Sequence, residues 1–363
     1  MNQFGRCFRL SLFGESHGPG VGVVVDGVPP GLPLDGAFLQ ADLDRRRPGA
    51  SALVSQRREP DAARILSGTF EGRTTGAPVC VWIENQDADG RPYAAARHVP
   101  RPGHADWTEH ARAQGFNDPR GGGHASGRLT APLVAAGALA RLALGPSIQV
   151  AAHLHHVGVH AGPQDALDAK RMAEGAAASP VFTAHRALEG QFMAAIEAAR
   201  RDRDSVGGVV EFVVEGLPVG LGEPFFDSVE SKLAHLLFAI PAAKGVEFGA
   251  GFGAARLRGS QHNDAYTVRD GRVAPASNHA GGALGGRTTG EPLRGRVAFK
   301  PTSTLPGRPQ PSVDLRTLEP AELAMAGRHD PCIAVRAVPV VEACVRIALA
   351  DLLLAAPGLH AHR

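Results

Sequence analysis

Apolar and polar positions along the chain predict strand–turn–helix units. Residues 21–28 are an apolar, β-branched run that ends in Gly-Val-Pro-Pro-Gly, and residues 34–45 then have the apolar spacing of a helix. The same strand–turn–helix pattern occurs again: residues 209–214 are followed by Glu-Gly-Leu-Pro-Val-Gly and then by a helical pattern over about 227–240. Asp227 and Glu230 have capping-box spacing, so they are expected to begin that helix.

Two further echoes indicate an internal duplication. Residues 72–78 (Gly-Arg-Thr-Thr-Gly-Ala-Pro) match 286–292 at six of seven positions, and each segment leads into a β-like run. The fainter echo pairs Arg120, Arg128 and Pro132 with Arg328, Arg336 and Pro339, each set before an Ala/Val-rich helix. Repeated turn chemistry alone is the competing explanation for the weaker echoes. Because all the echoes keep the same order, we expect two related α/β halves, about 1–145 and 190–350, with pseudo-two-fold symmetry.

Composition limits the class of protein. No Ser/Gly-rich or charge-run linker divides the 363 residues, so we expect a single intertwined domain over 1–363. The formal charge of +2 gives no reason to expect nucleic acid or a membrane surface as a partner. Cys7, Cys80, Cys332 and Cys344 form no C-x-x-C pair, and no leader or long apolar run is seen. These features favour a cytoplasmic protein with reduced thiols.

Three loop segments carry candidate proton-transfer groups. They are 14–18 (Gly-Glu-Ser-His-Gly), 101–106 (Arg-Pro-Gly-His-Ala-Asp) and 328–332 (Arg-His-Asp-Pro-Cys). Gly permits close approach of the backbone and Pro fixes a turn, so His17, His104 and Asp330 stand in loops suited to hold chemistry. The alternative is that His17 and His104 have structural roles, but their place in such loops makes that alternative less favoured.

Arginine is concentrated in two neighbouring loops. Arg45, Arg46 and Arg47 follow the first predicted helix, and Arg57 and Arg58 come shortly afterwards. Guanidinium forks match carboxylates and phosphates, which favours a small, multiply anionic ligand. A solvated helix end with surface ion pairs is the alternative. RNA binding fits less well, because no aromatic residues are interleaved with these arginines.

Glycines and hydroxyls indicate further anion contacts. Residues 120–128 (Arg-Gly-Gly-Gly-His-Ala-Ser-Gly-Arg) precede a helical pattern over about 129–143, where bare N–H groups can meet a phosphate. Residues 300–304 (Lys-Pro-Thr-Ser-Thr) add a cation and three hydroxyls.

The histidines at 153, 155, 156 and 160 raise the question of a metal site. No Cys, Asp or Glu with ligand spacing accompanies them, so a structural or surface role is favoured. A Ser-His-Asp hydrolase is disfavoured, since no Gly-x-Ser-x-Gly elbow is present.

Taken in order, the motifs resemble those of the chorismate synthase family along nearly the whole chain. The segments that carry the resemblance are 13–18, 42–49, 57–61, 101–106, 120–126, 244–247, 278–282 and 328–332. The resemblance implies that family's β-α-β sandwich fold and a homotetramer. It also implies a lyase that converts 5-enolpyruvylshikimate 3-phosphate to chorismate and phosphate by 1,4-elimination, the last step of the shikimate pathway in aromatic amino-acid biosynthesis.

The resemblance further implies a requirement for reduced FMN, although the reaction has no net redox change. By similarity, His17 protonates the departing phosphate, His104 protonates or balances the reduced flavin, and Asp330 helps to take the ring proton through the flavin. The arginine loops are expected to hold the substrate, and Arg46 also matches a position assigned to NADP. The flavin contacts carried over are His124, Ala125, Ser126, Pro241, Ala242, Gly285, Lys300, Pro301, Thr302, Ser303, Thr304 and Arg328.

Four positions depart from the family pattern. His124 and Ala125 replace Arg and Ser, Pro241 replaces Asn, and Ala52 stands where many members have Arg. The Ala52 change favours a separate flavin reductase over use of NADPH by the chain itself. Two rival functions stay open: a non-catalytic binder of an anionic ligand or RNA on the same fold, and a reduced-flavin lyase for a related phosphorylated cyclic acid.

Overall fold

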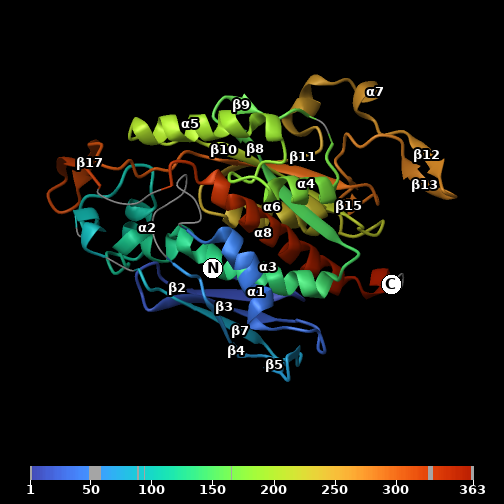
Figure 1. Cartoon of the computed structure of the whole chain (residues 1–363), viewed down its shortest axis with the longest axis horizontal. Helices are drawn as coiled ribbons and strands as arrows, with labels where there is room; N and C mark the ends of the chain where they lie inside the picture. Colours follow the sequence, from blue (N-terminus) through green and yellow to red (C-terminus); the bar gives the residue numbers. More distant parts are fainter. Residues whose placement is uncertain are drawn as a thin grey trace.

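Two five-stranded antiparallel sheets enclose a layer of helices (Figure 1). The computed structural model describes residues 2–48, 59–87, 90–93, 95–164, 166–325 and 330–360. The first sheet has the order β1 (Gln3–Phe4), β2 (Arg9–Gly14), β3 (Gly20–Asp26), β7 (Val79–Glu84) and β4 (Ala63–Ser67). The second has the order β11 (Ala243–Phe248), β16 (Leu293–Phe299), β10 (Gly208–Glu215), β8 (Gln149–Val157) and β9 (His160–Ala161).

The helices form an inner layer and an outer layer (Figure 1). Between the sheets lie α1 (Gly36–Arg46), α3 (Thr130–Leu144), α6 (Val229–Ala239) and α8 (Ala334–Ala355). The outer helices, α4 (Ala169–Ala177) and α5 (Glu189–Arg201), pack on the far side of the second sheet. The remaining elements are α2 (Asp106–Arg112), α7 (Gly259–His262) and four small hairpins: β5–β6 (Thr69–Phe70, Arg73–Thr74), β12–β13 (Tyr266–Arg269, Arg272–Pro275), β14–β15 (Ala283–Leu284, Arg287–Thr288) and β17–β18 (Gln310–Asp314, Glu319–Leu323).

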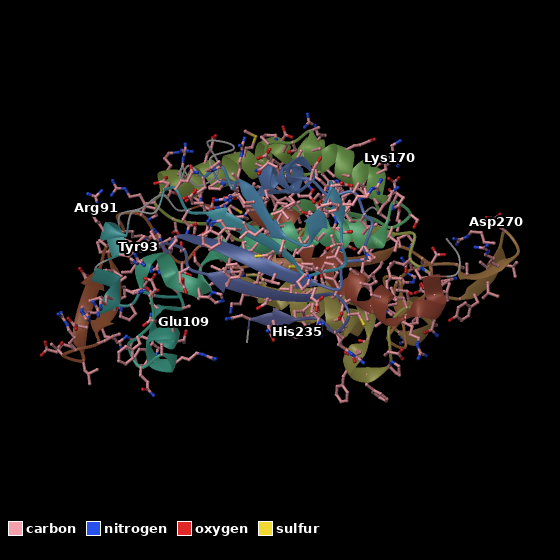
Figure 2. The ribbon with its side chains drawn as sticks, turned by 90° about the horizontal axis from the view of Figure 1, so that it is seen from below. Arg91, Tyr93, Glu109, Lys170, His235 and Asp270 are labelled. Atoms are coloured by element: carbon pink, nitrogen blue, oxygen red, sulfur yellow. The ribbon has the colours of Figure 1, made fainter. Side chains whose placement is uncertain are left out.

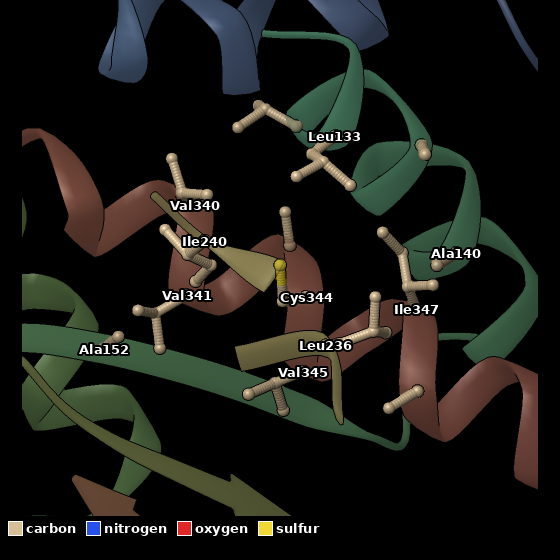
Figure 3. Close-up of a cluster of buried hydrophobic side chains, with 14 of the residues drawn as sticks. Leu133, Ala140, Ala152, Leu236, Ile240, Val340, Val341, Cys344, Val345 and Ile347 are labelled. Carbon is tan, nitrogen blue, oxygen red and sulfur yellow. The ribbon is translucent and has the colours of Figure 1, made fainter. Parts of the chain in front are cut away.

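The centre of the molecule is the contact between α3 and α8. A Cβ on Gly137 would lie 2.3 Å from the Cβ of Ala343, so only glycine allows the two backbones to come this close. Small and branched side chains such as Ala140, Cys344 and Ile347 fill the surrounding space (Figure 3). One apolar cluster continues from here to both sheets. We infer from this shared core that the two halves form a single folding unit.

The helical stretch Arg120–Leu144, which includes α3, has the length and apolar content of a membrane span. However, 78% of its most apolar window is buried inside the protein. Its composition is therefore accounted for by its place in the core.

The structure confirms the strand–turn–helix units and corrects one helix start. The predicted runs correspond to β3, α1, β10, α6 and α3 within a few residues. The capping box expected from Asp227 and Glu230 is wrong. Ser228 is the N-cap, and its side chain accepts from the N–H of Ser231 at 3.0 Å. Asp227 instead pairs with Arg6, which is distant in sequence, and with Lys232 in α6 itself.

The echoed turns make the same hydrogen bonds in both halves. Thr74 Oγ1 donates to Pro29 O at 2.7 Å and accepts from the N–H of Leu32 at 3.0 Å. Thr288 Oγ1 donates to Pro218 O at 2.6 Å and accepts from the N–H of Leu221 at 2.9 Å. These matching bonds support the proposed duplication.

Candidate active site

A cavity of about 440 Å³ collects most of the predicted site residues. It is lined by His17, Arg46, His104, Ala125, Ser126, Pro241, Ala242, Lys300, Pro301, Thr302, Ser303, Thr304 and Asp330. These residues come from loops of both halves of the chain. Three predicted site residues lie outside the part of the chain that the structure describes: Arg57, Arg58 and Arg328. The same holds for Ala52, which differs from the family pattern.

His17 stands in the short connection between β2 and β3. The ring of Tyr93 meets its imidazole edge-on, with centroids 5.1 Å apart. The guanidinium of Arg101 lies 5.3 Å from the centre of the same tyrosine ring. Tyr93 lies toward one end of the molecule, near the helix that carries Glu109 (Figure 2). Tyr93 thus connects the first predicted loop with the second.

Three consecutive glycines let both pocket histidines approach one loop. Gly121, Gly122 and Gly123 have φ values of 59°, 86° and 54°, which disfavour other residues. A Cβ on Gly121 would lie 2.3 Å from Cε1 of His17, and one on Gly122 would lie 2.7 Å from Cε1 of His104. The glycine loop therefore sets the space around both imidazoles.

His104 is oriented by an ion pair. Its Nδ1 lies 2.8 Å from Asp106 Oδ1, and Arg101 donates to both carboxylate oxygens of Asp106 at 2.7 Å. Burial raises the pKa of Asp106, but hydrogen bonds from Arg101 and His104 outweigh it and hold that pKa well below its usual range. Nδ1 of His104 also lies 3.1 Å from Nη2 of Arg101, so both partners hold this side of the ring and Nε2 is on the opposite side.

Two buried arginines share one carboxylate. Asp61 accepts from Nη1 of Arg46 at 2.9 Å and from Nη1 of Arg128 in a shorter contact. Burial and the nearby Arg336 lower the pKa of Arg46 to about 9, which leaves its guanidinium charged at neutral pH. Burial raises the pKa of Asp61, and the two arginines lower it by more. Arg46 and Arg128 thus form a fixed, positively charged part of the cavity lining, called the cationic wall below.

Asp330 is also held by an arginine. Arg336 donates through Nη1 to Asp330 Oδ2 at 2.8 Å and through Nε to Arg46 O at 3.1 Å. The hydroxyl of Thr302 donates to the backbone carbonyl of Asp330 at 2.7 Å. Asp330 is thereby joined to Arg46 through Arg336, and to the 300–304 loop through its backbone carbonyl.

Another part of the lining combines hydroxyls, lysines and apolar side chains. Lys300 and Ser303 both donate to the carbonyl of Gly103, and burial followed by the charge of Lys244 lowers the pKa of Lys300. The apolar residues of the lining include Ile240, Pro241, Ile333, Ala337 and Val340. A flat aromatic ring with a phosphate tail would find both kinds of contact here.

Four of the predicted contacts lie away from the described lining. Arg45 pairs with Glu342 at 2.6 and 2.9 Å, and Arg47 lies 3.6 Å from Asp44. The Nδ1 atom of His124 is 2.8 Å from Gly14 O, at the end of β2. Gly285 lies in the turn between β14 and β15. In this chain Arg45 is thus part of the helix core, and His124 anchors a strand.

Sequence reasoning gave no role to Tyr93, Lys244 or Arg336, which also line the cavity. Lys244 belongs to one of the quoted motifs, and Arg336 belongs to the fainter echo. A lone tyrosine in a polar stretch gave no signal of its contact with His17.

The second group of histidines lies elsewhere: His153, His155 and His156 are on β8, and His160 is on β9. His153 Nε2 is 3.2 Å from Glu211, and His155 Nδ1 is 2.7 Å from His156 Nδ1. Burial lowers the pKa of His155 to about 4. Among the described residues, no set of three His, Cys, Asp or Glu side chains could hold a metal ion. These contacts agree with a structural role.

Comparison with known proteins gives a consistent result. Residues 8–354 match the family model for chorismate synthase. The chain is 49% identical over 349 residues to the chorismate synthase of Korarchaeum cryptofilum, covering 96% of each protein. It is 48% identical to that of Chitinophaga pinensis, covering 98% of this chain and 97% of the relative. A crystal structure of chorismate synthase matches with a TM-score of 0.77 at 29% identity, covering 97% of this chain and 93% of that one.

Proposed function

Since this chain belongs to the chorismate synthase family, we propose that the basic cavity is where phosphate is eliminated from 5-enolpyruvylshikimate 3-phosphate, with reduced FMN as cofactor. The chain is a lyase of the shikimate pathway, which converts this substrate to chorismate and phosphate for aromatic amino-acid biosynthesis. The observation that carries the location of the site is the meeting of His17, His104 and Asp330 in one cationic cavity.

The charge of the lining suits this substrate, which has two carboxylates and a phosphate. Two acidic side chains, Glu59 and Asp330, face six cationic ones: Arg46, Arg101, Arg128, Lys244, Lys300 and Arg336. Arg46, Arg101 and Arg128 are held by buried carboxylates, so their orientation is fixed before the ligand arrives. We assign the four arginines of this set to the anionic groups of the substrate.

Each ionisable group has a proposed task. His17, beside the glycine loop, donates a proton to the phosphate as it leaves, and a positioned acid of this kind contributes about 10² to 10⁴ in rate. His104, oriented by Asp106, protonates the reduced flavin or balances its negative charge. Asp330, held by Arg336, helps to remove the ring proton. Because two bonds to the ring must break, these groups have to act within one cavity.

The residues present fit reduced FMN, which supplies transient electron density that weakens the C–O bond to phosphate. The apolar surface that includes Ile240, Ile333 and Val340 is suited to the ring system. Ser126, Lys300 and the hydroxyls of Thr302, Ser303 and Thr304 are suited to the phosphate tail. Ala125, Pro241, Ala242 and Pro301, which line the cavity, are further proposed contacts. Gly285, His124 and Arg328 stay proposed contacts by family resemblance alone.

We also propose a cytoplasmic homotetramer. Exposed aromatic side chains such as Phe225, 84% exposed, and Phe226, 93% exposed, support further assembly. Ala52 stands where many members of the family have Arg. We therefore propose that a separate reductase supplies the reduced flavin.

An anaerobic assay tests the proposal. Purified protein is mixed with substrate and chemically reduced FMN, and chorismate and phosphate are followed together. We expect equal amounts of both products, and none with oxidised FMN. Turnover without flavin would contradict the cofactor proposal. Competition with other phosphorylated cyclic acids tests the rival lyase, and binding without turnover would favour the non-catalytic rival.

A further inference from the structure

One amide side chain, that of Asn85, joins the His17 loop to the cationic wall. Asn85 follows directly after β7, which pairs with β3 beside the His17 loop. Its Nδ2 donates to Glu15 O and to Gly18 O, each at 2.9 Å, and its backbone N–H donates to Pro19 O at 3.1 Å. Glu15 precedes His17 in the sequence, and Gly18 and Pro19 follow it, so Asn85 holds the backbone on both sides of His17.

The other end of the same amide faces an arginine. Arg128 donates through Nε to Asn85 Oδ1 at 2.8 Å, and its Nη1 is bonded to Asp61, which also holds Arg46. A flipped amide would turn its oxygen toward two carbonyls and its NH₂ toward a guanidinium donor, so the orientation of Asn85 is fixed by its partners.

We propose that Asn85 is a positioning residue for His17, which sets the distance between the imidazole and the arginines that hold the substrate. This inference rests on the proposed role of His17 as the proton donor. The position needs two donors for carbonyls and one acceptor for a guanidinium. Asparagine supplies both in one small group, whereas aspartate supplies acceptors only.

The substitution Asn85→Asp separates the two functions of the amide. One carboxylate oxygen keeps the bond to Arg128, while the other faces the carbonyls of Glu15 and Gly18 and repels them. The arginine wall keeps its partner, but the His17 loop loses two hydrogen bonds. A displacement of about 1 Å in a catalytic group can lower a rate by roughly 10²-fold.

We expect N85D to lower kcat by about 10- to 100-fold under anaerobic conditions with reduced FMN. Substrate affinity, measured by calorimetry on the protein with oxidised FMN, should change by less than about threefold, because Arg128 keeps its acceptor. Gln261→Glu is the control for the change from amide to acid. Gln261 accepts from the N–H of Arg258 on the exposed helix α7, outside the cavity lining, and Q261E should behave as wild type.

A double-mutant cycle with His17→Ala decides the inference. If Asn85 acts through His17, N85D lowers kcat further by less than about twofold in the H17A protein. An equal loss from N85D with and without His17 would overturn the positioning role. Wild-type activity in H17A would instead overturn the proposed role of His17, so the two failures are distinguishable.

Asn85→Ala is the second variant, for the case that N85D does not fold as judged by its thermal unfolding. It removes the bonds to the loop and to Arg128 without adding a charge. Both a lower kcat and a weaker affinity are then expected, and the loss in kcat should again vanish in the H17A protein. A normal kcat in folded N85A would contradict the inference.

Discussion

Two regions of this protein gather histidines, and their surroundings differ in kind. In the cavity, His17 and His104 lie on loops against a run of glycines, among six cationic side chains. On β8, His153 and His155 are 0% and 1% exposed and contact Glu211, His156 and the carbonyl of Pro163. The contrast supports the proposal that the surroundings of a histidine, rather than its residue type, separate one suited to proton transfer from one that supports the fold.

The largest expected effect comes from removing both cavity histidines. His17→Ala combined with His104→Ala should lower kcat by at least about 10³-fold, because proton donation and charge balance are lost together. Single-turnover measurement of phosphate release under anaerobic conditions would give this number. A double variant within tenfold of wild type would show that the imidazoles are not needed.

A smaller effect is expected from the glycine loop. Gly121→Ala places a Cβ against the ring of His17 and should lower kcat by about tenfold through displacement of the imidazole. Gly72→Ala is its matched control: φ is also positive, at 73°, but nothing lies within 4 Å of the new Cβ. Both variants carry backbone strain of about 1 to 2 kcal/mol, so their unfolding midpoints should fall together. Equal kcat values for the two would exclude a specific effect on His17.

The smallest effect on activity is expected at His155, where stability should change instead. Burial favours neutral His155, so its pKa is about 4 in the folded protein against about 6.5 when unfolded. Between these pH values the unfolded chain binds more protons. The contribution of neutral His155 to the free energy of unfolding is therefore complete above about pH 6.5, and it is lost as the pH falls toward 4.

Denaturant unfolding of wild type and His155→Gln between pH 4 and 7 tests this sign. In wild type, His155 should make the free energy of unfolding rise with pH by up to about 1.4 kcal/mol per pH unit. This part of the pH dependence should be absent in the variant. Parallel curves for the two proteins would show that His155 does not titrate as described.

The sequence predicted the elements better than the directions of long side chains. Apolar periodicity located β3, α1, β10, α6 and α3, because it reflects burial in each segment. Arg45 and Arg46 are neighbours, yet one reaches Glu342 at 297 positions' distance and the other lines the cavity. Tertiary partners decide such choices, and local patterns contain no information on them.

The same reason explains which parts of the site were found. His17, His104 and Asp330 stand out among glycines and prolines, and the structure brings them together. Tyr93 and Asn85 act through contacts with residues far along the chain, so their types gave no signal. Ser228 caps α6, whereas the side chain of Asp227 pairs with Arg6 and Lys232, a choice that the local pattern does not show.

The most direct test of the contrast is one assay of chorismate and phosphate formation with reduced FMN, run on His17→Ala and His155→Gln at neutral pH. We predict that H17A lowers both products' rates by about 10²-fold or more, while H155Q stays within about threefold of wild type. Similar rates for the two variants would contradict the division between catalytic and structural histidines.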